Sequence, residues 1–374
     1  MAERFDVIIV GGGIAGASVA GSLGDGLRVL LLEAEDFPGY HTSGRSAAFY
    51  SETYGGPLVQ PLTTASLPFL LNPPEAFDGP LVSAPRGALY VGQEEQLGAV
   101  REMHGLYPGL DLEIISPERI AALAPALRPA WQATGLWEPA VRDIYTAAMH
   151  QGYLRRFQRA GGTVLTGQRV TALRQAGGCW RVQCGGQAYE ARILVNAAGA
   201  WADEVARLAG VAPVGLTPMR RTMVVLRVPG EEYRAEMPLV LDIGGSFYFK
   251  PDAGAYWVSP HDETPSAPCD AQPEELDVAI ALDRLEKATT FTISRPERSW
   301  AGLRTFAPDR VPVYGFEPDV PGFFWCAGQG GFGMQTAPAA GALCASLILG
   351  EALPQALADT GVNAASYAPA RFRK

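Results

Sequence analysis

A glycine-rich loop near the start of the chain, VGGGIAG at residues 10–16, constrains the fold more than any other feature. Before it, residues 5–10 are apolar and largely β-branched, which predicts a buried strand. After it, residues 14–23 are mostly small, which predicts a closely packed helix. A second apolar stretch, residues 28–33, ends on the acid Glu33. This order is typical of a dinucleotide-binding βαβ unit.

Each conserved position of such a unit has a physical role that this loop can fill. Gly11 permits the tight turn, Gly13 lets the backbone approach a pyrophosphate, and Gly16 lets the helix pack against the strand. Glu33 can accept hydrogen bonds from ribose hydroxyls and disfavours a 2′-phosphate, so FAD and NAD remain as candidates. A glycine-rich turn in an ordinary α/β domain is the alternative. The expected cofactor contacts here are Gly11, Gly13, Ile14, Ala15, Gly16, Glu33 and Ala34.

The composition narrows the class of protein. With 374 residues, of which 48% are hydrophobic and 18% charged, the chain is long enough for two globular domains. Its net charge of −9 disfavours nucleic acid as a partner. Five cysteines without a CxxC motif indicate a reducing compartment, and four scattered histidines predict no metal site. We expect no signal peptide and no transmembrane segment, and place the protein in the cytoplasm or peripherally at the inner membrane face.

Two kinds of sequence alternate along the chain. Buried-type strands and small-residue helices recur in residues 1–50, 140–210 and 301–374, which predicts a discontinuous Rossmann-type nucleotide-binding domain. Residues 51–139 and 211–300 contain shorter strands separated by turns, which predicts a second domain on a mixed, largely antiparallel sheet. The expected fold class is therefore α/β (α+β), with a ligand cleft between the domains. Helices are predicted at residues 117–123, 145–160 and 273–287, and strands include 188–190, 192–196 and 323–327.

A second glycine motif, GQGGFG at residues 328–333, also follows an apolar strand and opens a helix, which is expected to reach Leu349. A second dinucleotide would need a further strand that ends in an acid, and the chain finishes instead in a short tail. We therefore expect this loop to lie against a flat ring, with the helix N-terminus stabilising the negative charge of a reduced flavin. A connection required only by tight packing is the alternative.

These motifs, together with PGYH at 38–41, GRSAA at 44–48, NAAGAW at 196–201 and WAGLR at 300–304, occur as a set along nearly the whole chain. The set resembles the D-amino-acid oxidase/glycine oxidase family of FAD-dependent oxidoreductases, and within it most of all the bacterial D-arginine dehydrogenases. The resemblance implies an FAD-binding domain, a substrate domain with a large antiparallel sheet over the flavin, and oxidation of an amine at its Cα–N bond.

The resemblance also implies roles for individual residues. Arg304 is expected to clamp the substrate carboxylate with two hydrogen bonds, with Tyr248 donating to the same group and Arg221 adding charge. Tyr54, in a mobile segment at residues 51–57, is expected to close over the ligand as a lid. The carbonyl of Gly331 is expected to accept from the amine. Gln335 is expected to line the side-chain pocket. From the residues alone, Arg221 could instead pair with a surface acid and Tyr248 could be a core residue of the sheet.

Non-covalent FAD is the expected cofactor, because residues 302–306 contain no cysteine for a flavin linkage. By resemblance, residues 45–48 run along the isoalloxazine ring and Val170 contacts the adenine end. The expected contacts beyond the first βαβ unit are Arg45, Ser46, Ala47, Ala48, Val170, Ala198, Gly199, Trp201, Gly330, Gly331, Phe332, Gly333, Met334, Gln335 and Thr336.

Departures from the D-arginine dehydrogenase pattern bear on the substrate. Ala88 stands where that group has a glutamate for the guanidinium, and Phe49 stands where it has a histidine. A cationic side chain buried without a partner costs several kcal/mol, so we expect neutral, apolar or aromatic D-amino acids rather than D-arginine. Hydride would pass from Cα to flavin N5, and the imine would hydrolyse to a 2-oxo acid and ammonia.

The resemblance also bears on the electron acceptor and on the alternative activities. Residues 255–258 carry Trp257 and no lysine, so we expect a dehydrogenase that passes electrons to a quinone or another carrier rather than to oxygen. Rival activities are those of a 2-hydroxy-acid dehydrogenase, for example acting on 2-hydroxyglutarate, and of a secondary-amine oxidase. A non-catalytic FAD-binding protein is the alternative from a different class.

Overall fold

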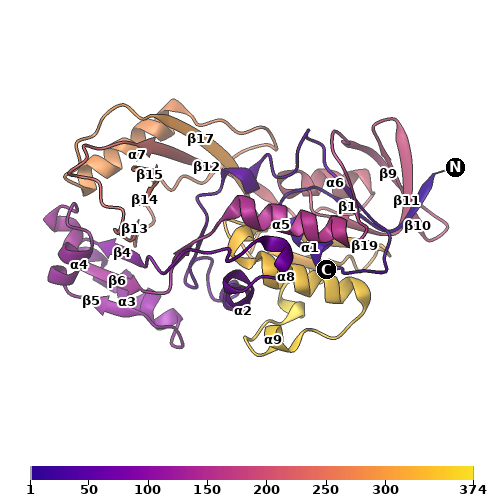
Figure 1. The fold of residues 1–374 in the computed structure, drawn as a ribbon, viewed down its shortest axis with the longest axis horizontal. Coiled ribbons are helices and arrows are strands. Elements are labelled where there is room, and N and C mark those ends of the chain that lie inside the picture. The colour runs from indigo at the N-terminus through magenta and orange to yellow at the C-terminus, as the bar shows by residue number, and fades with distance from the viewer. Residues whose placement is uncertain (1, 374) are drawn as a thin grey trace.

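The computed structural model describes residues 2–373, and its two large sheets occupy opposite ends of the long axis of the molecule (Figure 1). The first sheet has eight strands and a parallel core in the order β19, β11, β1, β2, β8. Strand β18 is added antiparallel at one edge, and β10 and β9 continue from β11. The strands are β1 (Glu3–Val10), β2 (Val29–Leu32), β8 (Thr163–Leu165), β9 (Val170–Ala176), β10 (Cys179–Cys184), β11 (Gln187–Asn196), β18 (Val313–Phe316) and β19 (Phe323–Ala327).

The central strand β1 is apolar on both faces because both faces are covered. Val7 and Ile9 belong to one buried cluster with the helices, and Ile8 and Val10 belong to another on the opposite face. This burial explains why the strand reads as a continuous apolar run. The helices of the first cluster are α1 (Ile14–Ser22), α2 (Gln60–Leu71), α5 (Thr146–Arg159) and α8 (Gly333–Leu349). On the opposite face lies α6 (Ala202–Leu208), and α9 (Gln355–Ala358) packs against α2.

The second sheet has ten strands, of which one neighbouring pair, β13–β4, is parallel. Its order is β20, β17, β12, β15, β14, β13, β4, β6, β5, with β16 beside β12. The strands are β4 (Ala88–Gly92), β5 (Glu113–Ile115), β6 (Thr134–Glu138), β12 (Thr217–Leu226), β13 (Leu239–Asp242), β14 (Tyr248–Asp252), β15 (Ala255–Ser259), β16 (Thr264–Pro265), β17 (Arg298–Phe306) and β20 (Gln329–Gly330).

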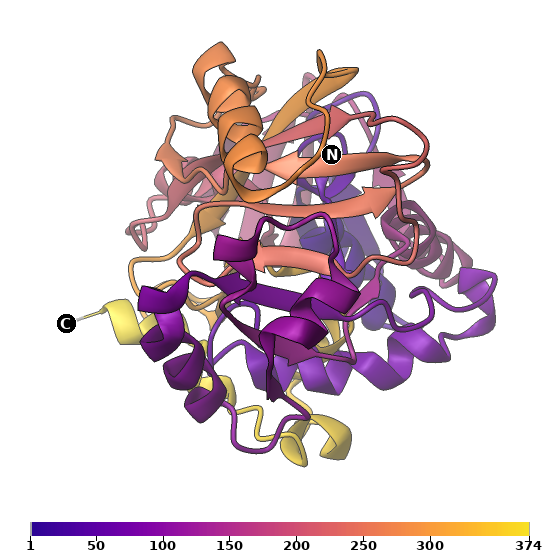
Figure 2. The ribbon, with the colours of Figure 1, turned by 90° about the vertical axis from the view of Figure 1, so that its left-hand side faces the viewer.

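The two faces of the second sheet have different partners. Helix α7 (Glu275–Ala288) lies above the sheet in Figure 2, and α3 (Leu97–Leu106) and α4 (Pro117–Leu123) lie beside its lower strands. Leu89 and Phe249 pack in the cluster under α7, whereas Ala88 and Tyr248 belong to the cluster on the other face. A short ribbon of β3 (Phe49–Tyr50) and β7 (Arg142–Asp143) brings Phe49 into this second cluster.

The chain passes from the first sheet to the second between β19 and β20, which are separated by Gly328 alone. In β17, Thr305 and Phe306 pair with Gly330 and Gln329 of β20, which comes just before α8. The second sheet therefore continues into the glycine motif at the start of a helix that covers the first sheet.

The predicted fold class is confirmed, and helices α1, α4, α5, α7 and α8 lie where the sequence predicts helices. The two strands expected at 188–196 form the single strand β11. Helices α2 and α3 were not predicted, because Pro61 and Pro68 make the region of α2 resemble an irregular loop. Two segments differ from the expected division of the chain. Residues 301–306, expected in the nucleotide-binding domain, belong to β17 of the second sheet. Helix α2, from the stretch expected in the second domain, packs against α8 beside the first sheet. Within residues 2–373, no helix combines the length and apolarity that a membrane span requires.

Candidate active site

The loop between β1 and α1 is shaped by backbone contacts that exclude side chains. Gly11 has φ +109°, and a Cβ there would lie 2.4 Å from the carbonyl oxygen of Ala197. A Cβ on Gly16 would lie 1.9 Å from the carbonyl oxygen of Gly11. Both positions therefore require glycine, and the loop passes close to the end of β11.

A cavity opens beside this loop at the carboxyl ends of the parallel strands. The Glu33 carboxylate is 9% exposed, accepts from the backbone N–H groups of Gly12 at 2.7 Å and Glu35 at 2.9 Å, and lines the cavity. Glu33 thus holds the glycine loop in addition to facing the cavity. The predicted cofactor residues that line it are Gly11, Gly13, Glu33, Ala34, Val170, Ala198, Gly199 and Trp201.

A second cavity adjoins the first and extends to the second sheet. Gly13, Ser43, Ala197 and Gly199 line both cavities, which together form one elongated cleft past the N-terminus of α1. The predicted cofactor residues in the second cavity are Ile14, Ala15, Arg45, Ser46, Ala47, Gly330, Gly331, Gly333 and Met334. Arg221, Tyr248 and Arg304 line the same cavity.

Several residues predicted to contact the cofactor lie beside the second cavity without lining it. The hydroxyl of Thr336 donates to the carbonyl of Phe332 at 2.9 Å, and Phe332 itself faces an outer hollow next to Tyr54. Ala48 lies outside both cavities, and its carbonyl accepts from the backbone N–H of Ile144. Arg45 does line the second cavity, but its guanidinium donates to the carbonyl oxygens of Ala271 and Ala301.

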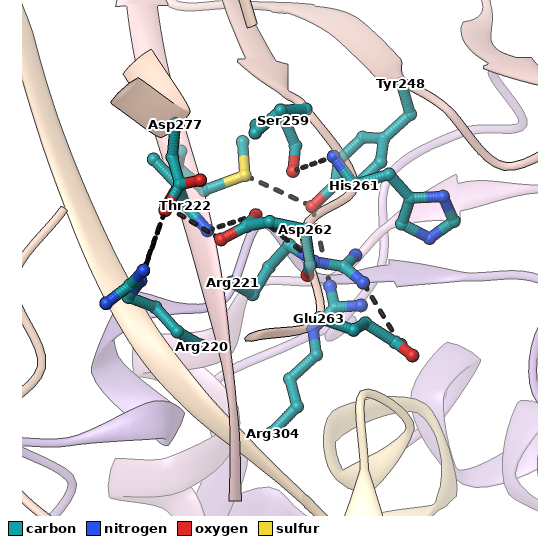
Figure 3. Close-up of polar contacts among 12 residues, drawn as sticks. Arg220, Arg221, Thr222, Tyr248, Ser259, His261, Asp262, Glu263, Asp277 and Arg304 are labelled. Carbon is teal, nitrogen blue, oxygen red and sulfur yellow. Dashed lines mark hydrogen bonds and ion pairs between the residues drawn. The ribbon is translucent and has the colours of Figure 1, made fainter. Parts of the chain in front are cut away.

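Arg221, Tyr248 and Arg304 converge at the far end of the cleft (Figure 3), and Tyr54 contacts Arg304 there. Arg304 on β17 donates from Nη1 to the Tyr54 hydroxyl at 2.5 Å and from Nη2 to the Tyr248 hydroxyl at 3.4 Å. In the register of β12 and β17, Arg221 pairs with Gly302, so Arg221 and Arg304 lie on the same face of the sheet. Four sequence-predicted residues, Tyr54, Arg221, Tyr248 and Arg304, are therefore brought together.

Arg221 is held by acids and still has one free donor. Its Nε donates to the carbonyl of Asp262 at 2.7 Å and its Nη2 to the Glu263 carboxylate at 3.2 Å. The side chain is 4% exposed, yet its Nη1 has no hydrogen-bond partner among the described residues. A buried N–H without an acceptor is costly, so this end of the cleft favours an anionic ligand.

The charge of the two arginines also acts on Tyr248. Burial raises the pKa of this phenol, but the positive charges of Arg304 and Arg221, together with hydrogen bonds to Ser259 and Arg221, outweigh burial and leave the pKa below its usual value. A phenol polarised in this way is a stronger hydrogen-bond donor. The cluster of two guanidinium groups and a phenol is suited to a carboxylate.

Comparisons with known proteins identify the family of the chain. The family model described as FAD dependent oxidoreductase (DAO) matches residues 6–347. The chain belongs to this family. A curated relative, FAD-dependent oxidoreductase domain-containing protein 1 of Bos taurus, is 26% identical over 405 residues, covering 93% of this chain and 82% of its own.

Solved structures share the fold. Glycine oxidase from Geobacillus kaustophilus superposes with a TM-score of 0.85 at 21% identity, covering 99% of each chain. L-proline dehydrogenase from P. horikoshii superposes with a TM-score of 0.84 at 20% identity, covering 100% of this chain and 98% of that one.

FAD is the cofactor of this family, and the cleft fits it on observations of this chain. Gly13, Ile14 and Ala15 at the N-terminus of α1 line the second cavity, where a diphosphate would meet the positive end of the helix, and Glu33 faces the first cavity. The second cavity extends from α1 past Gly331 to the two arginines. The first cavity would hold the adenosine half and the second the flavin. Within residues 2–373, no group of three or more His, Cys, Asp or Glu side chains could hold a metal ion.

The segment predicted to act as a lid is bonded to α8 in this structure. Ser51 is fully buried, and Gln335 of α8 accepts from its backbone N–H at 3.2 Å and donates to the carbonyl of Tyr54 at 2.9 Å. These bonds hold residues 51–54 in place in this structure, and Gly55 and Gly56 follow directly. Gln335 also does not line the second cavity, because its amide is fully used on this segment and on Thr63.

Phe49 and Ala88, predicted for the side-chain pocket, lie in the cluster that contains Tyr248 but do not line the second cavity. Phe49 packs edge-on against Tyr54, with ring centres 5.2 Å apart, and against Tyr248 at 6.3 Å. Ala88 is fully buried in the same cluster. Glu138 is opposite Ala88 on the neighbouring strand, and the sequence analysis did not single it out. Its carboxylate accepts hydrogen bonds from residues 51–53. Because these partners lie far away in the sequence, the place of Glu138 beside the site could have been found only from the pairing of β6 with β4.

The lowered pKa of His261, which lies near Arg221 and Arg304, should make the free energy of unfolding depend on pH. Burial, together with the charges of Arg221 and Arg304, lowers its pKa from 6.5 to about 3. The unfolded chain therefore binds more protons between these values, so the stabilising contribution is complete above about pH 6.5 and is lost as the pH falls toward 3. His261→Asn should flatten the pH dependence of the free energy of unfolding between pH 7 and 5, measured by urea denaturation.

His104 supplies the control for this experiment. It is an exposed histidine on α3, so His104→Asn should leave the slope of wild type unchanged. Asparagine suits position 261 because the backbone there has φ +56°, which asparagine tolerates well. Equal slopes for His261→Asn and wild type would show that His261 titrates normally in the folded state.

Proposed function

We propose that the chain catalyses FAD-dependent oxidation of D-amino acids with neutral, apolar or aromatic side chains to 2-oxo acids and ammonia. The observation that carries the proposal is the free Nη1 of buried Arg221, beside Arg304 and Tyr248, at the end of a cleft that fits FAD. The preference for the D-enantiomer rests on the sequence resemblance.

The carboxylate end orients the substrate. Arg304 and Tyr248 would bind the carboxylate oxygens, and Arg221 would donate its free N–H to the same group. The Gly331 carbonyl, on a residue that contacts both Arg304 and the second cavity, would accept from the amine. When bound, FAD supplies the acceptor for the hydride that leaves Cα. The described side chains supply binding and orientation.

The neighbourhood of Phe49 supports an uncharged substrate side chain. Phe49, Ala88 and Tyr248 belong to one apolar cluster. The acid nearest in strand register, Glu138, is 2% exposed and accepts hydrogen bonds from residues 51–53. A guanidinium or ammonium group placed here would lose its hydration without gaining a free carboxylate.

An anaerobic flavin-reduction screen tests the proposal. The purified holoenzyme is mixed with D- and L-amino acids, and loss of the visible flavin absorbance is followed. We expect D-phenylalanine, D-leucine or D-methionine to reduce the flavin with a kcat/KM at least tenfold above that of D-arginine and of the L-enantiomers. D-Arginine ranking first would contradict the proposed pocket.

The same screen separates the rival activities. Reduction by a 2-hydroxy acid with no reaction of amines would favour a hydroxy-acid dehydrogenase, and reduction by sarcosine or proline alone would favour a secondary-amine oxidase. Flavin that no compound reduces would favour a binding protein without catalysis.

We also propose that FAD is bound non-covalently and that electrons leave to a quinone or another carrier. The region around Arg304 has no cysteine, and Trp257 occupies the middle of β15. The nearby Lys250 ammonium is engaged by Asp143 at 2.7 Å and Asp252 at 3.0 Å. Denaturation should release all of the flavin. Oxygen uptake close to the rate with a quinone would contradict the dehydrogenase assignment.

A further inference from the structure

We propose that Glu138 is a positioning residue that holds residues 51–54 so that Tyr54 lies on Arg304 before the substrate binds. This inference rests on the proposed function, in which Arg304 binds the carboxylate. Glu138 is the last residue of β6, opposite Ala88 of β4, and lies on the face of the second sheet that the cleft reaches.

Three donors from one short segment converge on the Glu138 carboxylate. Its Oε2 accepts from Ser51 Oγ at 2.9 Å and from Thr53 Oγ1 at 2.6 Å, and its Oε1 accepts from the backbone N–H of Glu52 at 2.7 Å. The one hydroxyl proton of Thr53 is used on the carboxylate. Tyr90 therefore donates its own proton to Thr53 Oγ1 at 2.8 Å. The hydroxyls of Ser51 and Thr53 both donate to Oε2. A glutamine side chain with its NH₂ group at that place would therefore direct its own protons at these two hydroxyl protons.

The segment is also held from its other side. Gln335 on α8 bonds to the backbone of Ser51 and Tyr54, and the Tyr107 hydroxyl donates to the carbonyl of Thr53 at 2.9 Å. The carboxylate on the second sheet and the amide on α8 thus fix the four residues between them. The Tyr54 hydroxyl then meets Arg304, so the two groups are arranged before the ligand arrives.

The burial of Glu138 argues for a positional requirement. A carboxylate at 2% exposure carries a desolvation penalty that an apolar side chain of similar volume would avoid. What a carboxylate adds at this position is the ability to accept several hydrogen bonds from one segment at once. We infer that this arrangement is retained for the geometry of residues 51–54.

Glu138→Gln tests the inference because it preserves shape and removes one acceptor. We expect KM for the best amino acid and Kd for benzoate, followed by flavin absorbance, to rise about tenfold each, with kcat within threefold. Hydrogen exchange of the amides of residues 51–57 should become at least tenfold faster, while those of β4 and β6 stay protected. Unchanged KM and unchanged exchange would overturn the proposal, as would equal loss of protection across the second sheet.

Two further variants separate positioning from general stability. Asp203 is a buried carboxylate that accepts from the backbone N–H groups of Val214, Gly215 and Leu216, away from the arginines. Asp203→Asn should lower the melting temperature and leave KM and the exchange of residues 51–57 unchanged. Thr53→Val alone should raise KM. In the Glu138→Gln background, the same substitution should raise KM by a smaller factor than it does in wild type. Full additivity would contradict a shared anchor.

The outcome is distinguishable from failure of the proposed function. The exchange measurement and the benzoate titration use the holoenzyme without turnover. If no amino acid reduces the flavin, the proposed function fails, while faster exchange of residues 51–57 in Glu138→Gln still supports the anchor. If amino acids reduce the flavin and Glu138→Gln behaves as wild type, the anchor alone is refuted.

Discussion

Arg304→Ala is expected to raise KM for amino-acid substrates more than a hundredfold while FAD stays bound. Arg304 is the guanidinium that joins Tyr54 and Tyr248 at the end of the cleft. Charge-assisted hydrogen bonds to a carboxylate are each worth about 1.5–3 kcal/mol, and two of them exceed the ~2.7 kcal/mol that a hundredfold change requires. Steady-state kinetics give KM, and the visible spectrum of the purified variant gives the flavin content.

The controls separate this role from general damage. Arg304→Lys retains the charge but not the two-pronged geometry, so it should recover only part of the loss. Arg119, half-exposed on α4 and paired with Glu113, is remote from the cleft, and Arg119→Ala should leave KM within twofold of wild type. Loss of flavin from Arg304→Ala would show that the arginine supports the cofactor rather than the substrate.

Gly16→Ala is expected to abolish FAD retention and to lower the melting temperature. The added Cβ would lie 1.9 Å from the carbonyl oxygen of Gly11, and backbone cannot move aside as a flexible side chain does. Relief requires that α1 or the glycine loop shift, at a cost of about 3 kcal/mol or more. The shift would also displace the backbone N–H groups at the N-terminus of α1. Flavin content after gel filtration and thermal unfolding measure the two effects.

A helix glycine without neighbours provides the matched control. Gly98 lies exposed in α3, and a Cβ there meets nothing within 4 Å. Gly98→Ala should keep FAD and stabilise the protein by up to about 1 kcal/mol, because alanine is the better helix former. A Gly16→Ala protein that keeps its flavin and melting temperature would contradict the packing argument.

The sequence was most informative where local pattern and function coincide. The strand, loop and helix at residues 3–22 follow from apolar runs and from glycines that only a close backbone approach requires. Helix α2 was not predicted because its sequence contains two prolines. Pro61 falls in the first turn, where proline is tolerated, and Pro68 lies near the end of the helix. Neither position disrupts the helix as proline in a central turn would.

The candidate site was predicted in part, and its omissions share one cause. Arg304 lies in a recognisable motif, but Glu138 lies in none. Its position beside residues 51–53 depends on the pairing of β6 with β4, which no single-sequence pattern specifies. Gln335 was expected to line the pocket, and its bonds to Ser51 and Tyr54, more than 280 positions earlier in the chain, were likewise beyond single-sequence patterns. Contacts of this kind anchor residues 51–54, which the sequence analysis described only as a lid.

The pairing of β17 with β20 has a mechanical consequence. Arg304 and the glycine motif at residues 328–333 belong to neighbouring strands joined by backbone hydrogen bonds, with Thr305 opposite Gly330. A rotation of one half of the molecule against the other would carry both together. If Arg304 binds the substrate carboxylate and the glycine motif faces the flavin, as proposed, this pairing would help to keep their spacing constant when the two halves of the molecule move.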